Sequence, residues 1–204
     1  VLRDDAPATP KITDEDRQWW AFQPVTNPSV PEADSTGWSR NEVDNFISRK
    51  LQATRLSPAP EADRRTLIRR VYADMIGLPP GNEDVEAFVN DESADAWQKV
   101  IDRLLDSPQY GERWGRHWLD LVRYSESDGY RADGYRQTMW RYRDWVIQSL
   151  NNDKPFDQFV REQIAGDELD PHNPDAVVAT AYWRLYLYEY NQRDVRGHWR
   201  AIID

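Results

Sequence analysis

The chain contains no cysteine among its 204 residues. A disulfide, a thiolate-bound metal and the covalent attachment of a c-type haem are therefore excluded within it. Histidine is almost as scarce, because His117, His172 and His198 are the only three and their spacing matches no zinc motif. No apolar run approaches the roughly 20 residues that a membrane-spanning helix needs. The sequence thus predicts no membrane span and leaves the redox compartment open.

Sequence motifs of several familiar enzyme classes are also missing. There is no glycine-rich phosphate loop, no Gly-x-Ser-x-Gly nucleophile turn and no His-Glu-x-x-His helix. The formal net charge of −10 argues against binding to a phosphate backbone, since such binding needs a basic field. We therefore expect no nucleic-acid partner, and the sequence does not decide whether the protein is an enzyme.

Aromatic residues are abundant, with ten Trp and ten Tyr. Such large side chains allow a sizeable core although the hydrophobic content is only 39%. Residues 1–38 are rich in proline and are expected to form an extended tail or linker, which Trp19, Trp20 and Phe22 pin onto the domain. Residues 39–204 carry apolar side chains mostly at helical spacing, so we expect one helical domain there.

The predicted fold is all-α, an irregular domain of seven or eight helices. Ser39 and Glu42 are expected to form a capping box at the start of the first helix. Pro155 is expected to open a later helix that ends at Gly166 and turns Phe156, Phe159, Val160 and Ile164 inward. Only Arg184–Tyr190 has any strand-like alternation. The other helices are expected over about Glu61–Ile76, over Pro108 to about Tyr124, and around Val85–Val89, Trp97–Leu105, Met139–Leu150, Phe156–Ile164 and Val177–Leu185.

The segment Tyr110–Tyr130 is the most informative part of the chain. Gly111 and Gly115 lie four apart on one helix face, although each costs about 1 kcal/mol relative to Ala in a helix interior. This spacing predicts that another helix approaches closely there. The neighbouring apolar stripe is expected to anchor the core, with ligand stacking as the alternative; it consists of Trp114, Trp118 and Leu121.

Polar residues of the same helix form a candidate site. Arg113, His117, Asp120 and Tyr124 share one side at helical spacing. A hydrogen bond from the His117 ring to the Asp120 carboxylate would orient the imidazole for acid–base chemistry or for ligation, and His117 is the only candidate metal ligand. The same pattern is also typical of a buried structural network. The candidate catalytic residues are His117, Asp120, Arg116, Arg123 and Tyr124, and Arg113 is a candidate ligand-binding residue.

Two further groups are candidate ligand-binding sites. Glu126, Asp128 and Asp133 lie near glycines in a polar loop, where carboxylates could hold calcium, although turn formation and helix capping explain them more simply. Trp183 and Tyr186 belong to an aromatic run that could stack on a sugar or pack against another helix. Both alternatives stay open for each group.

Several segments resemble a known family. These include Trp20-Ala-Phe-Gln-Pro-Val25, Ile76-Gly-Leu-Pro-Pro80, Tyr110-Gly-Glu-Arg-Trp-Gly-Arg-His-Trp-Leu-Asp120, Tyr142-Arg-Asp-Trp-Val146 and Asn152-Asp-Lys-Pro-Phe-Asp-Gln-Phe159. In this order they resemble the planctomycete cytochrome-C-associated domain of unknown function. The chain starts at Val1 without Met and ends at Asp204 within an apolar pattern, so we expect it to be a fragment of a longer protein.

The resemblance implies an exported protein, periplasmic or on the cell surface, in which other domains of the same polypeptide are the partners. It also implies a Cys-x-x-Cys-His stretch beyond this fragment, which would suit haem c or a metal, while no cofactor is expected within the fragment itself. Three functions follow as expectations. The first is a redox-linked module whose main ligands lie downstream, the second binds or acts on polysaccharide, and the third is a structural docking domain.

Overall fold

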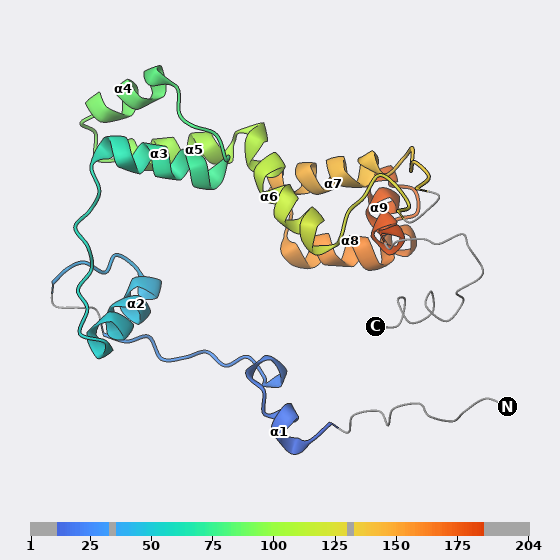
Figure 1. The fold of residues 1–204 in the computed structure, drawn as a ribbon, viewed down its shortest axis with the longest axis horizontal. Helices are drawn as coiled ribbons and strands as arrows, with labels where there is room; N and C mark the ends of the chain where they lie inside the picture. The colour runs from blue at the N-terminus through green and yellow to red at the C-terminus, as the bar shows by residue number, and fades with distance from the viewer. Residues whose placement is uncertain (1–11, 33–35, 130–132, 186–204) are drawn as a thin grey trace. The chain divides into compact units, whose positions relative to one another are not determined.

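The computed structural model describes residues 12–32, 36–129 and 133–185. Every regular element in these ranges is helical, and the single isolated β-bridge pairs Ser127 with Tyr135. The predicted all-α class is therefore confirmed (Figure 1). The chain divides into two compact units, Val1–Glu61 and Ala62–Asp204.

The N-terminal unit contains α1 (Asp14–Arg17), the 3-10 turn η1 (Trp20–Phe22) and α2 (Glu42–Ala53). A helical turn thus interrupts the segment expected to be extended, because Thr13 and Asp16 form a capping box. Within this unit the aromatic side chains around η1 are exposed, so their predicted pinning onto the domain stays a prediction.

The cap of α2 differs from the prediction. Asn41, and not Ser39, is the N-cap residue, and its side-chain oxygen accepts a hydrogen bond from the Asp44 amide at 2.9 Å. Asn and Ser are about equally good N-cap residues, so the sequence alone does not decide between Ser39 and Asn41.

The second unit begins with α3 (Arg64–Met75), α4 (Asn82–Asn90) and α5 (Ala96–Leu105). Asp63 caps α3 by accepting a hydrogen bond from the Thr66 amide at 2.9 Å. After the C-cap of α3, Gly77 adopts φ +71°, a left-handed conformation that glycine tolerates. The shared core of the three helices consists of Ile68, Tyr72, Phe88, Ala96, Val100 and Leu104.

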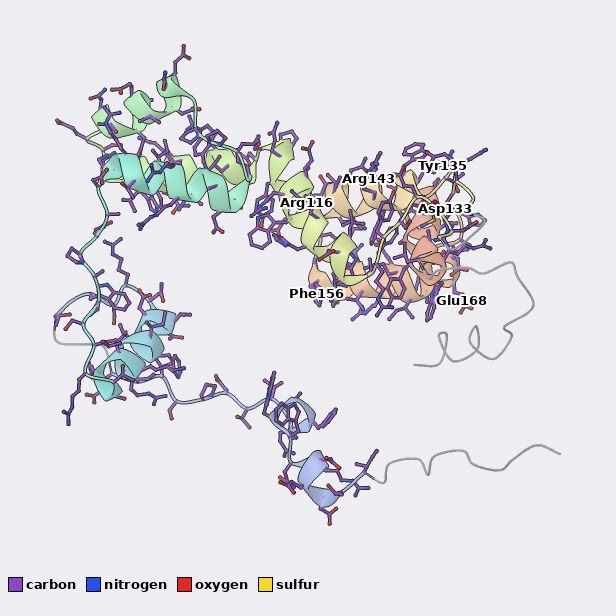
Figure 2. The ribbon with its side chains drawn as sticks, in the orientation of Figure 1. Arg116, Asp133, Tyr135, Arg143, Phe156 and Glu168 are labelled. Carbon is purple, nitrogen blue, oxygen red and sulfur yellow. The ribbon has the colours of Figure 1, made fainter. Side chains whose placement is uncertain are left out.

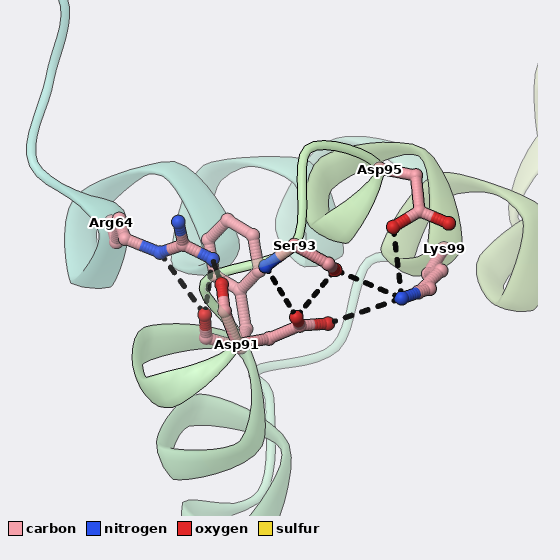
Figure 3. A network of polar contacts seen from close by, with 6 residues as sticks. Arg64, Asp91, Ser93, Asp95 and Lys99 are labelled. Carbon is pink, nitrogen blue, oxygen red and sulfur yellow. Dashed lines mark hydrogen bonds and ion pairs between the residues drawn. The ribbon is translucent and has the colours of Figure 1, made fainter.

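A polar network closes the connection between α4 and α5 (Figure 3). The Arg64 guanidinium donates hydrogen bonds to the main-chain carbonyls of Phe88 and Asp91, at 3.0 and 2.7 Å. It also lies 4.2 Å from the centroid of the Phe88 ring. Lys99 joins Asp91, Ser93 and Asp95. Arg64 therefore satisfies the free carbonyls at the end of α4, which is a structural role.

The rest of the unit consists of α6 (Pro108–Leu121), α7 (Trp140–Asn151), α8 (Phe156–Leu169), α9 (Pro174–Ala179) and the 3-10 segment η2 (Thr180–Arg184). Their core is more aromatic than that of α3–α5. The buried residues are Met139, Tyr142, Trp145, Val146, Phe159, Ala179 and Leu185.

The predicted close approach at the glycines of α6 is confirmed. A Cβ atom added to Gly111 would collide with the Ile147 carbonyl oxygen and would lie 2.6 Å from Cγ of Asn151. Asn151 also accepts a hydrogen bond from the Gly111 amide at 2.7 Å. Gly115 faces the same helix, with Ile147 Cγ1 3.2 Å from an added Cβ. The glycines therefore let α6 and α7 pack at backbone distance.

Two predicted helix ends are wrong. The helix α6 stops at Leu121 and Arg123 turns the chain with φ +57°, so Tyr124 lies outside the helix. The helix α8 passes through Gly166 to Leu169, with a kink at Ala165. Gly166 allows close packing and does not end the helix, since an added Cβ would collide with the Ala176 carbonyl oxygen. Phe156 and Ile164, expected to be buried, are exposed.

Candidate functional site

The outward face of α6 lines a pocket of about 300 Å³. Trp114, His117, Trp118 and Leu121 recur at helical spacing and form one wall. The opposite wall comes from the end of α7, the following turn and the start of α8, where Phe156 is labelled in Figure 2. Its residues are Ser149, Leu150, Lys154, Phe156 and Phe159. Two helices that are distant in sequence from α6 thus complete the pocket.

A buried hydrogen-bond network fixes one wall of this pocket. The Trp118 indole N–H is 3.1 Å from both the Tyr142 hydroxyl and Oε1 of Gln163. The Tyr142 hydroxyl donates to the same Gln163 oxygen at 2.6 Å, and the Gln163 amide donates to the Phe159 carbonyl at 2.9 Å. Burial raises the pKa of Tyr142 to about 12. Trp118 is therefore held by satisfied polar partners and its ring is preorganised.

Aromatic stacking continues beneath the pocket. The Phe159 ring meets the edge of Trp118 at 5.0 Å and stacks on Trp145 at 5.0 Å between ring centroids. The Lys154 ammonium lies 4.9 Å from the centroid of Trp145 and forms an ion pair with Glu162. Both of these charged side chains are largely buried, so the pocket wall carries a neutralised pair.

His117 lies on the pocket wall without the predicted partner. Its ring centroid is 5.4 Å from that of Trp114. Among the described residues, no hydrogen bond or ion pair links the His117 side chain to Asp120, and both residues are exposed. The predicted orientation of His117 by Asp120 is therefore not formed, and His117 contributes an open imidazole edge to an aromatic pocket.

The other predicted residues of this helix are dispersed. Arg116 is exposed on α6, as Figure 2 shows, and Arg123 is exposed in the turn after it. Arg113 packs against Gly77, and its buried Nε has no hydrogen-bond partner among the described residues. The structure thus does not bring these three arginines together with His117.

Tyr124 belongs to a separate polar cluster. Its hydroxyl donates to Oε1 of Glu126 at 2.9 Å, and Arg143 of α7 donates to the same oxygen at 2.8 Å. Burial, together with the neighbouring Glu126 carboxylate, raises the pKa of Tyr124 well above its usual range. Arg143 also pairs with Asp144 at 3.0 Å, so the cluster is internally satisfied.

The carboxylates of the polar loop have structural partners. Asp128 forms an ion pair with Arg136 at 2.6 Å, where each side chain is only 12% exposed. Asp133, which has φ +38°, accepts a hydrogen bond from the Gly129 amide at 3.1 Å. In the part of the chain that the structure describes, no group of three or more His, Cys, Asp or Glu residues could hold a metal ion. Turn formation accounts for Asp128 and Asp133, and Glu126 accepts from Tyr124 and Arg143.

The predicted aromatic platform is only partly described. Trp183 is 64% exposed, and its indole N–H donates to the Ile164 carbonyl at 3.0 Å, next to the kink of α8. Tyr186 lies outside the described residues. Trp114 and Leu121 were expected to anchor the core and Phe156 to face inward, but all three are exposed. These expectations, and the absence of any predicted role for Lys154, are why the sequence did not predict the pocket. The one indication in the sequence was that Lys154 and Phe156 both lie in Asn152–Phe159, one of the segments that resemble the family.

The described part of the second unit is thus a helical domain with a pocket lined largely by aromatic side chains. The family model described as PSCyt2, a protein of unknown function (DUF1549), matches residues 42–203. The chain therefore belongs to this family, which is the planctomycete cytochrome-associated domain of unknown function. No curated protein and no solved structure matches the chain. None of the described helices is both long and apolar enough to cross a membrane.

Proposed function

We propose that this domain is a docking module, which holds another domain of its own polypeptide through the α6–α8 pocket. One observation carries the proposal: aromatic and aliphatic side chains stand exposed around a pocket whose wall is rigid. The exposed fractions are 38% for Trp114, 72% for Leu121 and 69% for Phe156. Contiguous apolar side chains of this kind mark interaction surfaces, because leaving them in water is unfavourable.

The polar groups of the pocket favour docking over binding of a polysaccharide. A sugar ring needs several hydrogen-bonding groups that converge on its hydroxyls. Here the Trp118 N–H is engaged by Tyr142 and Gln163. The Lys154 ammonium is engaged by Glu162. The pocket therefore offers a sugar mainly apolar rings.

The resemblance to exported proteins suggests where the docking takes place. We propose that the partner domains lie in the same exported polypeptide, in the periplasm or at the cell surface. Cell fractionation of the full-length protein, with a periplasmic marker as the reference, checks this location. Recovery of the protein in the cytoplasmic fraction would contradict it.

Binding between this domain and the flanking domains of the full-length polypeptide, each produced separately, tests the proposed function. We expect isothermal titration calorimetry to detect an interaction that a Trp114→Ala/Phe156→Ala double variant weakens by about tenfold or more, because aromatic anchors dominate interfaces. Trp140→Ala is the matched control, since Trp140 is 41% exposed on α7 and does not line the pocket. No binding to any flanking domain would refute the docking function.

A redox-linked module is the second candidate function, and the open imidazole of His117 favours it. A haem or metal held by a neighbouring domain could gain His117 as a ligand, since a neutral imidazole is a common metal ligand. If so, His117→Ala in the full-length protein shifts the haem absorption bands or lowers the bound metal. An unchanged spectrum and metal content would exclude His117 as a ligand.

A further inference from the structure

The size of the α6–α8 pocket limits what can occupy it. Its volume of about 300 Å³ lies at the lower end of the roughly 300–1,000 Å³ that small-molecule pockets span. There is room for one ring system and not for a row of sugar rings. Trp114 and Trp118 on one side and Phe156 and Phe159 on the other supply ring faces and edges to a flat occupant.

The charge of the pocket favours a neutral occupant. Among the described residues, Lys154 is the only Lys or Arg side chain that lines it, and Glu162 neutralises this ammonium. An anion therefore meets no unpaired lysine or arginine here, and a cation meets no lining carboxylate. A neutral ring loses the least hydration on entry and gains the most contact, so it is the complementary occupant.

Among the described residues, His117 adds a polar ring edge that is not engaged, and the Ser149 hydroxyl on the opposite wall is a second polar group of the lining. The His117 ring lines the pocket beside Trp114 and has no hydrogen-bond partner among the described residues. An imidazole nitrogen can accept from, or donate to, a polar atom on the rim of an occupant. A ring that carries one hydrogen-bonding group thus satisfies His117, and a purely hydrocarbon ring does not.

We infer that the pocket receives a tryptophan or tyrosine side chain from a peptide segment of the docking partner. This inference rests on the docking function proposed above and specifies its chemistry. The indole or phenol ring lies among the four aromatic rings, and its N–H or O–H hydrogen-bonds to His117. Aromatic anchors that enter pockets with one polar tip satisfied are the usual centres of protein interfaces.

Small ring probes test the inference on the chain as it exists. The probes are N-acetyl-tryptophanamide and N-acetyl-tyrosinamide, with N-acetyl-phenylalaninamide and methyl β-glucoside as comparisons. Binding is followed by the indole N–H signals of Trp114 and Trp118 in ¹H–¹⁵N NMR spectra, assigned by single Trp→Phe substitutions. We expect saturable shifts with the first two probes, binding about threefold or more weaker for the phenylalanine amide, and no shift with the glucoside.

Variants separate the pocket from the rest of the surface. Phe156→Ala is expected to weaken binding of the tryptophan amide about tenfold, and Trp140→Ala is expected to leave it unchanged. His117→Ala is expected to remove the preference over the phenylalanine amide. Phe156→Leu keeps the inference testable if Phe156→Ala does not fold, and it should weaken binding less than an alanine does.

Opposite results would overturn the inference without ambiguity. Shifts with the glucoside alone would make the pocket a sugar site. No shift with any amide, while a flanking domain still binds, would leave the docking function in place and exclude an aromatic anchor. Binding of the amides without binding of any flanking domain would refute docking within the polypeptide and retain an aromatic-ring site.

Discussion

Gly111 and Gly115 sit four residues apart on α6, yet they meet α7 in different ways. At Gly111 the nearest atoms are the Ile147 backbone carbonyl and the Asn151 amide group, which cannot move aside easily. At Gly115 the nearest atom is Cγ1 of the Ile147 side chain, at 3.2 Å from an added Cβ, and the nearest backbone atom is 3.9 Å away. Replacement by alanine is therefore expected to cost more stability at Gly111 than at Gly115.

Gly111→Ala is expected to lower the free energy of unfolding by about 1–3 kcal/mol, because the overpacked Cβ must push α7 away. Gly115→Ala is the matched variant in the same helix, and its better helix propensity offsets a small clash of its methyl group. Its free energy of unfolding should stay within about 1 kcal/mol of wild type. Urea unfolding measures both, and equal losses for the two variants would contradict the difference in contact.

The burial of Tyr142 makes the free energy of unfolding fall at high pH. Its ordinary pKa of 10.0 is raised to about 12 in the folded protein by burial, so the folded state holds the proton more tightly than the unfolded state. The stabilisation is complete below pH 10 and is lost as the pH rises from about 10 to 12, because the unfolded state then binds fewer protons.

Tyr142→Phe should therefore flatten the fall of stability between about pH 10 and 12. At neutral pH it is expected to cost about 0.5–1.5 kcal/mol, since Gln163 and the Trp118 N–H each lose one hydrogen bond but keep the bond between them. Tyr135→Phe is the control, because Tyr135 is largely exposed. Urea midpoints measured across pH check both effects, and an unchanged slope in Tyr142→Phe would show that Tyr142 is not the group responsible.

At the scale of elements, a largely buried ion pair between Asp128 and Arg136 holds the described part of the loop between α6 and α7. The Asp128–Arg136 pair lies across the Ser127–Tyr135 bridge. Arg136 also donates a hydrogen bond to the Arg184 carbonyl at 2.8 Å, which ties the loop to η2. A largely buried charge that loses its partner is costly, so this pair fixes the loop against the C-terminal elements.

Asp128→Asn is expected to destabilise the protein by about 3–5 kcal/mol, because the largely buried Arg136 guanidinium loses the carboxylate charge that lies 2.6 Å from it. Asp157→Asn removes an exposed pair with Arg161 in α8 and should cost no more than about 0.5 kcal/mol. Thermal unfolding and protease cleavage of the loop give the two readouts. If Asp128→Asn loses as little stability as Asp157→Asn, water already solvates the Asp128–Arg136 pair.

At the scale of the whole molecule, the all-α fold was predictable because apolar residues recur at helical spacing through most of the chain. Local ends were less predictable, since Ser39 and Asn41 are both good caps and Gly166 is compatible with either a stop or a close contact. The candidate site was predicted only in part. His117 and Trp114 could be placed on one helix, but Phe156 reaches them through the packing of α8, which no local pattern encodes.

The contact between Gly166 and the Ala176 carbonyl also determines how force passes between α8 and α9. The helices α8 and α9 touch there through backbone atoms, with no flexible side chain between them. Leu185, at the end of η2, is anchored in the core beside Phe159. A pull on the chain at Leu185 is therefore transmitted into α8, whose opposite end begins with Phe156.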